Sequence, residues 1–265
     1  MSVLRILGVR SAARVFARAK QETLPCLQQL DNPEQEVDLI ESYIKARAVN
    51  GVPLRILEAG CGQRWPLKLS GVNFVLTGID LDKKALEIRK NVAGDLDEGI
   101  AGDLCSIDLG EKHFDVIYNS FVLEHVEHAD RALSNFSKWS RPGTLVVLKI
   151  PDPHSVRGFI TRVTPHWFHV FYYRYVLGCK NAGKPGYAPY ATYYHPVVSR
   201  AGIRRFCQDH NFTICQERGD GGYQPFGKGA VALATRLIVH AVHALSFRRL
   251  TSKHTDLLYI LEKSH

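Results

Sequence analysis

The sequence lacks several patterns that would assign it to a protein class at once. Its six cysteines never form a CxxC pair, so neither a zinc site nor a dense disulfide framework is indicated. No uninterrupted apolar stretch is long enough to span a bilayer. Nothing resembles an RNA-recognition or zinc-finger motif, and no internal repeat or low-complexity segment is visible. These absences favour a globular protein of a reducing compartment, and the expected location is the cytoplasm.

Length and composition set the scale of the fold and the kind of partner. A chain of 265 residues fits one α/β domain with insertions, and an apolar content of 45% is enough for a full core. The net charge of +8 indicates an anionic partner, such as a nucleic acid, an acidic lipid surface or a phosphorylated substrate. Because the basic residues are scattered, a nucleic-acid partner is the less favoured of these.

The N-terminus is basic and has alternative interpretations. Five basic residues precede the first acidic one, Glu22: Arg5, Arg10, Arg14, Arg18 and Lys20. With apolar residues between them, they are compatible with an amphipathic helix on a membrane surface, which would make the protein membrane-associated. They are also compatible with an organelle transit segment or with a basic helix packed on the domain edge.

Apolar strand-like runs alternate with helical patterns over the next hundred residues. A helix is expected over 33–49, another after Asp80, and a third over 130–140. Strands are expected over 54–57, 74–79, 114–118 and 144–150, and 100–104 is expected to be the end of another strand. Arg141-Pro142-Gly143 is expected to form a turn. This order predicts βαβ units and a parallel sheet that is covered on both faces.

The rhythm changes after Pro151. Residues 152–198 contain proline, glycine and many aromatic residues. A helix is then expected over 200–210, with Ser199 as its N-cap, followed by strands over 212–216 and 256–262. A glycine-rich loop and an apolar helix over 230–247 separate these two strands.

A glycine loop and three polar residues follow successive strands. Gly60 and Gly62 let the backbone turn tightly and approach a ligand closely. Asp80 ends the next strand, where a carboxylate can accept both hydroxyls of a ribose. A dinucleotide enzyme also fits this pairing, but the third position of its GxGxxG motif falls here on Trp65, which is too bulky for that fold.

Two further strand ends narrow the interpretation. Asp103 closes the third strand, where its carboxylate can accept a hydrogen bond from an adenine amino group. Asn119 lies at the end of the fourth strand. Because the carboxyl ends of parallel strands meet at one edge of an open sheet, all these side chains are expected around one ligand.

The ordered set of motifs resembles the class I S-adenosylmethionine-dependent methyltransferases, and most closely the methyltransferase type 11 branch that includes ubiquinone-pathway enzymes. The runs that carry this resemblance are LEAGCG at 57–62, GID at 78–80, GDL at 102–104, FDVI at 114–117, LEHV at 123–126 and RPGT at 141–144. It implies a Rossmann-like, doubly wound α/β fold. Its seven-stranded sheet would be mostly parallel with an antiparallel last strand, and the aromatic-rich insertion would follow strand 5.

The resemblance also implies a domain division and a set of cofactor contacts. Residues 1–50 would form a basic helical region and 51–265 the methyltransferase domain, with an acceptor lid over 152–198 and a loop and apolar helix inserted over 219–250. S-adenosyl-L-methionine would be the cofactor. The implied roles are a cofactor loop of Glu58, Gly60 and Gly62, ribose binding by Asp80, adenine contacts by Asp103 and Leu104, and a place for Asn119 near the methionine amino group.

Transfer to a hydroxyl requires a group that removes its proton. His125, which follows the fourth strand, is the first candidate; His195 and His154 are further ones. Some ubiquinone-pathway relatives carry a metal-binding glutamate three residues before the Glu-His pair, where this sequence has Phe121, so no metal is expected.

The acceptor stays open at this point, as does the oligomeric state. The aromatic insertion and the apolar helix favour a small-molecule, sugar or lipid-linked acceptor, methylated on oxygen, and contact with a membrane surface. The alternatives are a nucleic-acid methyltransferase, supported only by charge, and a non-catalytic scaffold that keeps the cofactor site.

Overall fold

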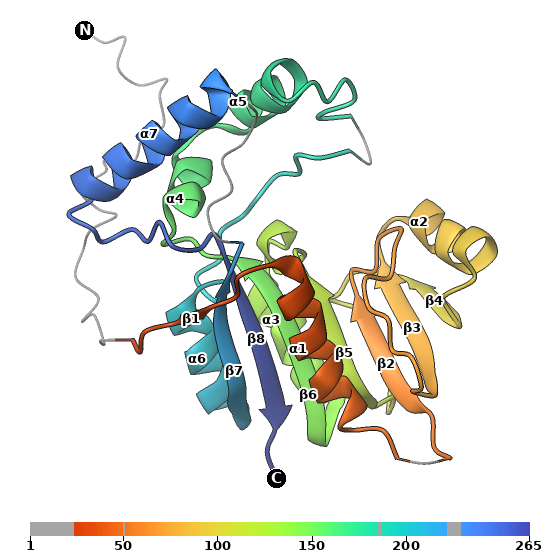
Figure 1. Cartoon of the computed structure of the whole chain (residues 1–265). Coiled ribbons are helices and arrows are strands. Elements are labelled where there is room, and N and C mark those ends of the chain that lie inside the picture. The colour runs from red at the N-terminus through yellow and green to blue at the C-terminus, as the bar shows by residue number, and fades with distance from the viewer. Residues whose placement is uncertain (1–23, 50, 185–186, 222–228) are drawn as a thin grey trace, which may run out of the picture.

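The computed structural model describes residues 24–49, 51–184, 187–221 and 229–265. The basic N-terminal segment and most of the glycine-rich loop therefore lie outside the described residues. An eight-stranded sheet in the order β1-β7-β8-β6-β5-β2-β3-β4 forms the centre of the described chain (Figure 1). Its strands are β1 (Gln28–Gln29), β2 (Leu54–Ala59), β3 (Phe74–Asp80), β4 (Glu98–Ala101), β5 (Phe114–Ser120), β6 (Ser140–Pro151), β7 (Phe212–Asp220) and β8 (Asp256–Lys263).

The strand directions confirm the predicted α/β class. Neighbouring strands are parallel, except that β8 runs antiparallel to both β6 and β7. The expected number of seven strands was wrong, because the two-residue β1 adds an eighth at the edge beside β7. Two glutamines carry no apolar pattern, so this strand arises only from its pairing with β7.

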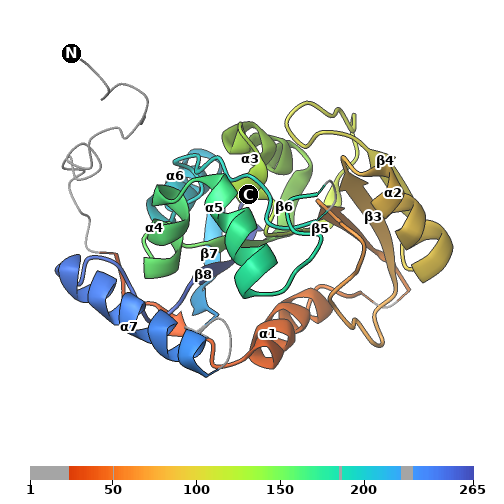
Figure 2. The same ribbon diagram turned by 90° about the horizontal axis from the view of Figure 1, so that it is seen from above.

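Helices cover both faces of the sheet, as the continuous apolar strands predicted. Figure 2 shows α3 and α6 on one side of the sheet and α1 on the other. The helical segments are α1 (Pro33–Lys45), α2 (Lys83–Ile88), η2 (Arg89–Ala93), η3 (Leu123–His125), α3 (Ala129–Lys138), α4 (Val156–Val163), α5 (His166–Phe171), η4 (Tyr172–Val176), α6 (Arg200–Asp209) and α7 (Ala230–Leu245). Phe136 and Phe206 pack into one core, and Ile40 and Ile44 pack into the other.

Helix starts follow from capping residues in the sequence. Asn32 accepts a hydrogen bond from the Gln35 amide at 2.9 Å and begins α1, with Pro33 in the first turn. Ser199 accepts from the Gly202 amide at 3.1 Å and begins α6, which confirms the predicted N-cap.

The predicted turn at Arg141-Pro142-Gly143 needs a correction, because these residues lie inside β6. The pairing of β6 with β5 jumps from Phe114 opposite Ser140 to Val116 opposite Leu145. The tripeptide is therefore a bulge in a long strand. Proline and glycine mark the irregularity correctly, but pairing on both sides of it continues the strand.

Three helical segments of the insertions lie together above one edge of the sheet. Figure 1 shows α4, α5 and α7 at the top, over the ends at which the parallel strands finish. We call residues 153–198 and 221–255 the cap. Among the described residues, no helix has the length and apolar character needed to cross a membrane.

Candidate functional site

The glycine loop after β2 packs closely against the end of β3 and against the residues that follow β5. Gly60 has φ +80° and Gly62 has φ +51°, values that favour glycine. The Gly60 amide donates to the Ile79 carbonyl at 2.8 Å, which holds the loop against β3. A Cβ on Gly60 would lie 2.3 Å from Val122 Cγ2, whereas one on Gly62 would meet nothing within 4 Å. The loop is therefore packed at its first glycine and open at its second.

Asp80 lies at the tip of β3, partly exposed beside this open glycine. Its Oδ2 accepts from the Gly62 amide and its Oδ1 from the Asp82 amide, each at 2.8 Å. These two bonds fix the carboxylate plane and leave a lone pair on each oxygen for further donors. The glycine loop and the acidic residue at the end of β3 thus lie together, and the Asp80 carboxylate can accept hydrogen bonds from two neighbouring hydroxyls.

Glu58, at the end of β2, is bound by Arg89. Its carboxylate lies 2.9 Å from Arg89 Nη2, and both side chains are buried. Arg89 also donates to the Cys61 carbonyl at 2.7 Å and to Asp95 Oδ1 at 2.6 Å. Burial raises the pKa of Glu58 to about 8, although Arg89 opposes the shift. Within the expected cofactor loop, Glu58 therefore positions the backbone through Arg89.

The next two predicted residues, Asp103 and Leu104, follow β4 and do not end it as expected, because the strand stops at Ala101. Asp103 is exposed, and its Oδ1 accepts from the Cys105 amide at 2.9 Å. Leu104 is buried in the core, and its carbonyl accepts from Asn135 Nδ2 at 2.8 Å. The Gly102 amide donates to the Asp80 carbonyl at 3.0 Å, which keeps this tip beside the previous one. Only Asp103 presents a polar side chain here.

Asn119 occupies the tip of β5 and is completely buried. Its Nδ2 donates to the Ala59 carbonyl at 2.7 Å, directly before the glycine loop, while its Oδ1 has no partner. A buried acceptor without a donor is costly unless a ligand or water supplies one. This atom, the open space at Gly62 and the carboxylate of Asp80 fit the ammonium and ribose hydroxyls of an adenosyl amino acid.

His125 ends the turn η3 that follows β5. Its Nδ1 lies 2.7 Å from the Ala191 carbonyl, which can only accept, so Nδ1 carries the proton and Nε2 has its lone pair free to accept one. The Tyr190 ring meets the imidazole edge-on, with centroids 5.6 Å apart. Burial lowers the pKa of His125, which keeps the ring neutral. The geometry suits a general base.

Glu124, beside His125, was not singled out from the sequence as a functional residue. It is buried, and its Oε2 has no hydrogen-bond partner. Its Oε1 lies 3.9 Å from His125 Nε2, too far for a hydrogen bond. Burial raises the pKa of Glu124 to about 8, which favours the neutral acid near pH 7. The Glu-His motif was the signal that could have identified it.

His195 and His154 have other surroundings. His195 Nδ1 accepts from the Val197 amide at 3.2 Å, and its Nε2 lies 3.5 Å from Asp130 Oδ1, so both ring nitrogens face polar groups. His154 is exposed, and its Nδ1 lies 3.8 Å from Asp152 Oδ1. These contacts favour His125 as the base, and the role of His195 stays a prediction.

Lys149 marks a charged cluster that sequence reasoning missed. It lies near the end of β6, where it is paired with Asp220 Oδ2 at 2.6 Å and with Glu36. Its Nζ also lies 5.1 Å from the centre of the Phe121 ring. Burial opposes the charge, but Glu36 and Asp220 outweigh it and raise the pKa of Lys149. A lysine within the apolar run of 145–150 was the available signal.

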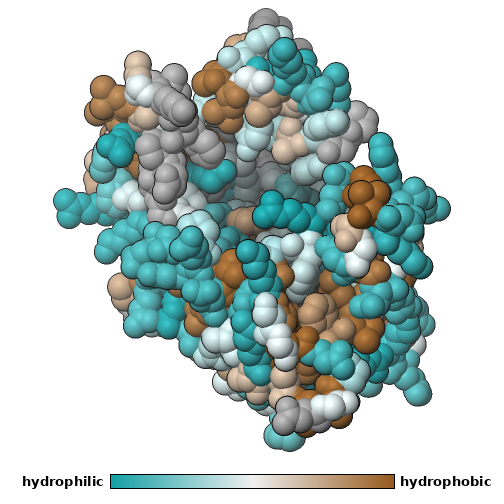
Figure 3. All heavy atoms as spheres, turned by 45° about the vertical axis from the view of Figure 1, so that its right-hand side comes forward, coloured by the Kyte–Doolittle hydropathy of each residue, from teal (hydrophilic) through white to brown (hydrophobic). Residues whose placement is uncertain are grey.

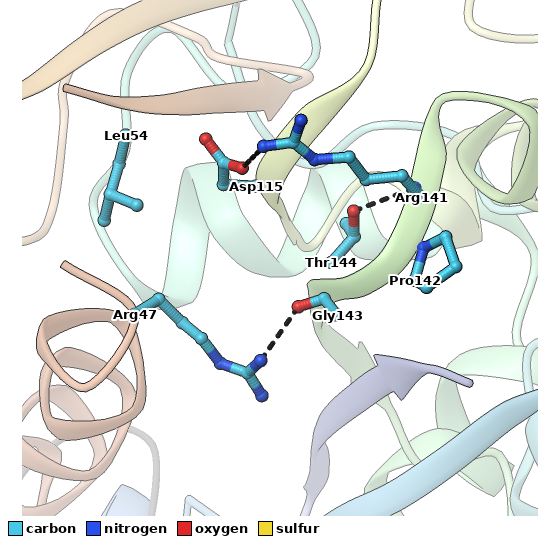
Figure 4. A pocket seen from close by; sticks show the side chains of 7 residues that line it. All are labelled: Arg47, Leu54, Asp115, Arg141, Pro142, Gly143 and Thr144. Carbon is cyan, nitrogen blue, oxygen red and sulfur yellow. Dashed lines mark hydrogen bonds and ion pairs between the residues drawn. The ribbon is translucent and has the colours of Figure 1, made fainter. Parts of the chain in front are cut away.

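A hollow of about 300 Å³ lies at the other end of the strands. Figure 4 shows Arg47 bonded to the Gly143 carbonyl and Arg141 paired with Asp115 around it. These residues lie before or near the amino ends of β2, β5 and β6, whereas open α/β sheets bind ligands at the carboxyl ends. We therefore place the candidate site at the glycine loop. Across the described ranges, no group of three potential ligands could hold a metal ion.

The family profile described as "Methyltransferase domain" matches residues 16–217. No curated protein matches the sequence.

Solved structures with TM-scores above 0.5 share the fold at low sequence identity. The YcgJ protein from Bacillus subtilis is 11% identical, with 88% of this chain and 99% of that chain covered and a TM-score of 0.53. The putative methyltransferase in complex with the Haloferax volcanii Trm112 activator is 12% identical, with 88% and 91% covered and a TM-score of 0.53. The magnesium protoporphyrin IX methyltransferase from Synechocystis PCC 6803, with bound S-adenosylmethionine, is 16% identical, with 87% and 79% covered and a TM-score of 0.46.

Proposed function

This chain belongs to the methyltransferase domain family, and we propose that it transfers the methyl group of S-adenosyl-L-methionine to a hydroxyl of a small-molecule, sugar or lipid-linked acceptor. The observation that carries the proposal is the convergence of three strand tips on one opening. Asp80 is locked to the Gly62 amide there, and the orphan oxygen of Asn119 lies behind the same loop.

Each strand tip has one role in holding the cofactor. Asp80 accepts the ribose hydroxyls, Asn119 Oδ1 accepts from the methionine ammonium, and Asp103 accepts from the adenine amino group. Leu104 anchors the last of these tips in the core. When bound, the cofactor supplies an electrophilic methyl group on a sulfonium sulfur.

His125 acts as the general base. Its Nε2 takes the proton of the acceptor hydroxyl while that oxygen receives the methyl group. Glu124 stays protonated near pH 7, so no carboxylate beside the imidazole raises its pKa. His195, engaged by Asp130 and Val197, is the second candidate for this step.

The aromatic insertion serves as the acceptor lid. The Tyr193 amide donates to the Glu124 carbonyl at 2.9 Å, and the Ala191 carbonyl accepts from His125. These contacts join the insertion to the turn that carries the proposed base. An acceptor held under the lid would therefore lie beside His125 and be shielded from water.

Calorimetry with S-adenosylmethionine tests the cofactor site. Asp80→Ala should weaken binding at least tenfold, since it removes an ionised acceptor of hydrogen bonds. Asp108→Ala, at an exposed carboxylate whose Oδ1 also caps a backbone amide, is the matched control and should bind normally. Unchanged affinity of Asp80→Ala in a folded protein would remove the ribose assignment.

The acceptor is found by incubating the enzyme with labelled cofactor and a fractionated extract that includes the lipid fraction. Mass spectrometry then identifies the compound and the atom that gain the methyl group. His125→Gln should lower turnover about a hundredfold or more without changing cofactor affinity, and it should remove the acidic limb of the pH profile. A normal rate and profile in this variant would exclude His125 as the base.

A further inference from the structure

The outer face of α7 is apolar where a surface helix of a soluble protein is usually polar. Leu233, Leu237 and Leu245 recur at multiples of four residues and are 61%, 62% and 79% exposed. The opposite face is the packed one, since Val239 is only 3% exposed. Residues at this spacing share one helix face, so the exposed leucines form a continuous stripe.

The aromatic helix α5 and its continuation η4 add a second exposed apolar surface to the cap. Trp167, Phe171 and Tyr175 follow one another at intervals of four residues, and Trp167 is 68% exposed. Figure 3 shows brown, apolar side chains at the surface in the upper part of the molecule, where the cap lies. Tryptophan and tyrosine are the residues that favour the boundary between lipid and water.

The same part of the chain is free of acidic residues. Residues 153–198 and 221–255 contain ten lysines and arginines and no aspartate or glutamate, whereas the rest of the chain has 24 basic and 26 acidic residues. The positive net charge of the protein thus resides in the cap. A hollow of about 230 Å³ under α7 is lined by Arg236, Val239, His240 and Ser252, so donors for an anion lie beside the apolar stripe.

We propose that the face formed by α7 and α5, the docking face, binds the surface of a bilayer that contains anionic phospholipid. Apolar side chains would enter the interface while the neighbouring basic groups meet lipid phosphates. An RNA partner would use the charge but not the exposed leucines. If the proposed function holds, docking also favours a lipid-linked acceptor. The cap lies over the carboxyl ends of the parallel strands, so a hydroxyl held at the membrane surface would enter the site through it.

Cosedimentation of the full chain with vesicles tests the docking face without cofactor or acceptor. The chain should bind phosphatidylcholine vesicles containing phosphatidylglycerol at least tenfold more tightly than pure phosphatidylcholine, and 0.5 M salt should weaken this binding. Leu237→Glu should reduce binding about tenfold or more, since it removes apolar surface that docking would bury in the bilayer and adds a charge that anionic lipid repels. Val92→Glu, at an exposed valine on the other side of the protein body, is the matched control and should bind like the wild type.

Two further variants separate the sources of binding. Replacement of Arg248 and Arg249 by Gln should lower only the phosphatidylglycerol-dependent part, by about tenfold. Replacement of the four arginines between Arg5 and Arg18 by Gln should leave the effect of Leu237→Glu intact. Binding that Leu237→Glu leaves unchanged, preferential binding of RNA that competes with vesicles, or a dimer that Leu237→Glu dissociates would each overturn the proposal. Vesicle binding by Asp80→Ala distinguishes a failed cofactor site from a failed docking face.

Discussion

Replacing Arg89 by Met tests how the glycine loop is held. The Arg89 side chain is 0% exposed and the Glu58 side chain 5%, so the substitution leaves a buried carboxyl and the Cys61 carbonyl without their donors. Removing one partner of a buried ion pair costs about 3–5 kcal/mol of unfolding free energy. The third contact, to Asp95, adds less than about 1 kcal/mol, because that carboxylate is 32% exposed and screened by water.

The loss should depend on pH with a definite sign. In the folded wild type, burial raises the pKa of Glu58 to about 8 from an ordinary value of 4.5. The folded state therefore holds this proton more firmly than the unfolded state, and its contribution to stability is lost as pH rises from 4.5 through 8. Without Arg89, which opposes the shift, the pKa rises further. Arg89→Met should accordingly cost more at pH 8.5 than at pH 5.5.

Urea unfolding at these two pH values measures both effects. Lys90→Met, at the exposed neighbouring position, is the control and should change the unfolding free energy by less than about 0.5 kcal/mol. Glu58→Gln in the Arg89→Met background should recover part of the loss, because no buried charge remains, with a coupling of about 1–3 kcal/mol. A loss below about 1 kcal/mol, or one that is equal at both pH values, would refute this account of the loop.

Two other predictions concern glycine packing in the loop and the buried carboxyl of Glu124. Gly60→Ala should cost about 2–4 kcal/mol of unfolding free energy, because residue 60 has a positive φ and its new Cβ would clash with Val122. Gly62→Ala should cost only about 1 kcal/mol, because its Cβ would meet no neighbour. Equal losses in urea unfolding would contradict this difference in packing. Glu124→Gln should raise the melting temperature above that of the wild type, and the rise should be larger at pH 9 than at pH 6. Burial raises the pKa of Glu124 to about 8, so the stability that the protonated Glu124 gives the wild type is lost as pH rises from 4.5 through 8. A constant difference between the two melting curves would show that Glu124 does not titrate in this range.

The sheet was largely predictable because its strands carry their own signal. Continuous apolar runs with turn residues at their ends located β2, β3, β5 and β6. The edge strand β1 was missed, since two glutamines become a strand only by pairing with β7. The extent of β6 was missed for a related reason: Pro142 and Gly143 read locally as a turn, and the pairing that makes them a bulge involves residues far away in the sequence.

The candidate site divides in the same way. Asp80 and the glycines follow from local order, because a strand end and the loop after it place them at the same edge. The orientation of Glu58 does not, since it depends on Arg89, 31 residues further along the chain. The pairing of Lys149 with Glu36 spans 113 residues. Charge partners at such separations are products of the tertiary fold, and a single sequence does not indicate them.

In the proposed reaction, His125 connects the two halves of the site. Its backbone belongs to the turn after β5, beside the strand tips, whereas its Nδ1 donates to the Ala191 carbonyl of the cap insertion. That bond selects the tautomer with a free Nε2. In the closed position the lid therefore both covers the acceptor and holds the imidazole in the tautomer that can accept a proton. If the lid lifts from η3, the ring loses this selection and gains solvent. Proton removal and exclusion of water would then depend on the same contact.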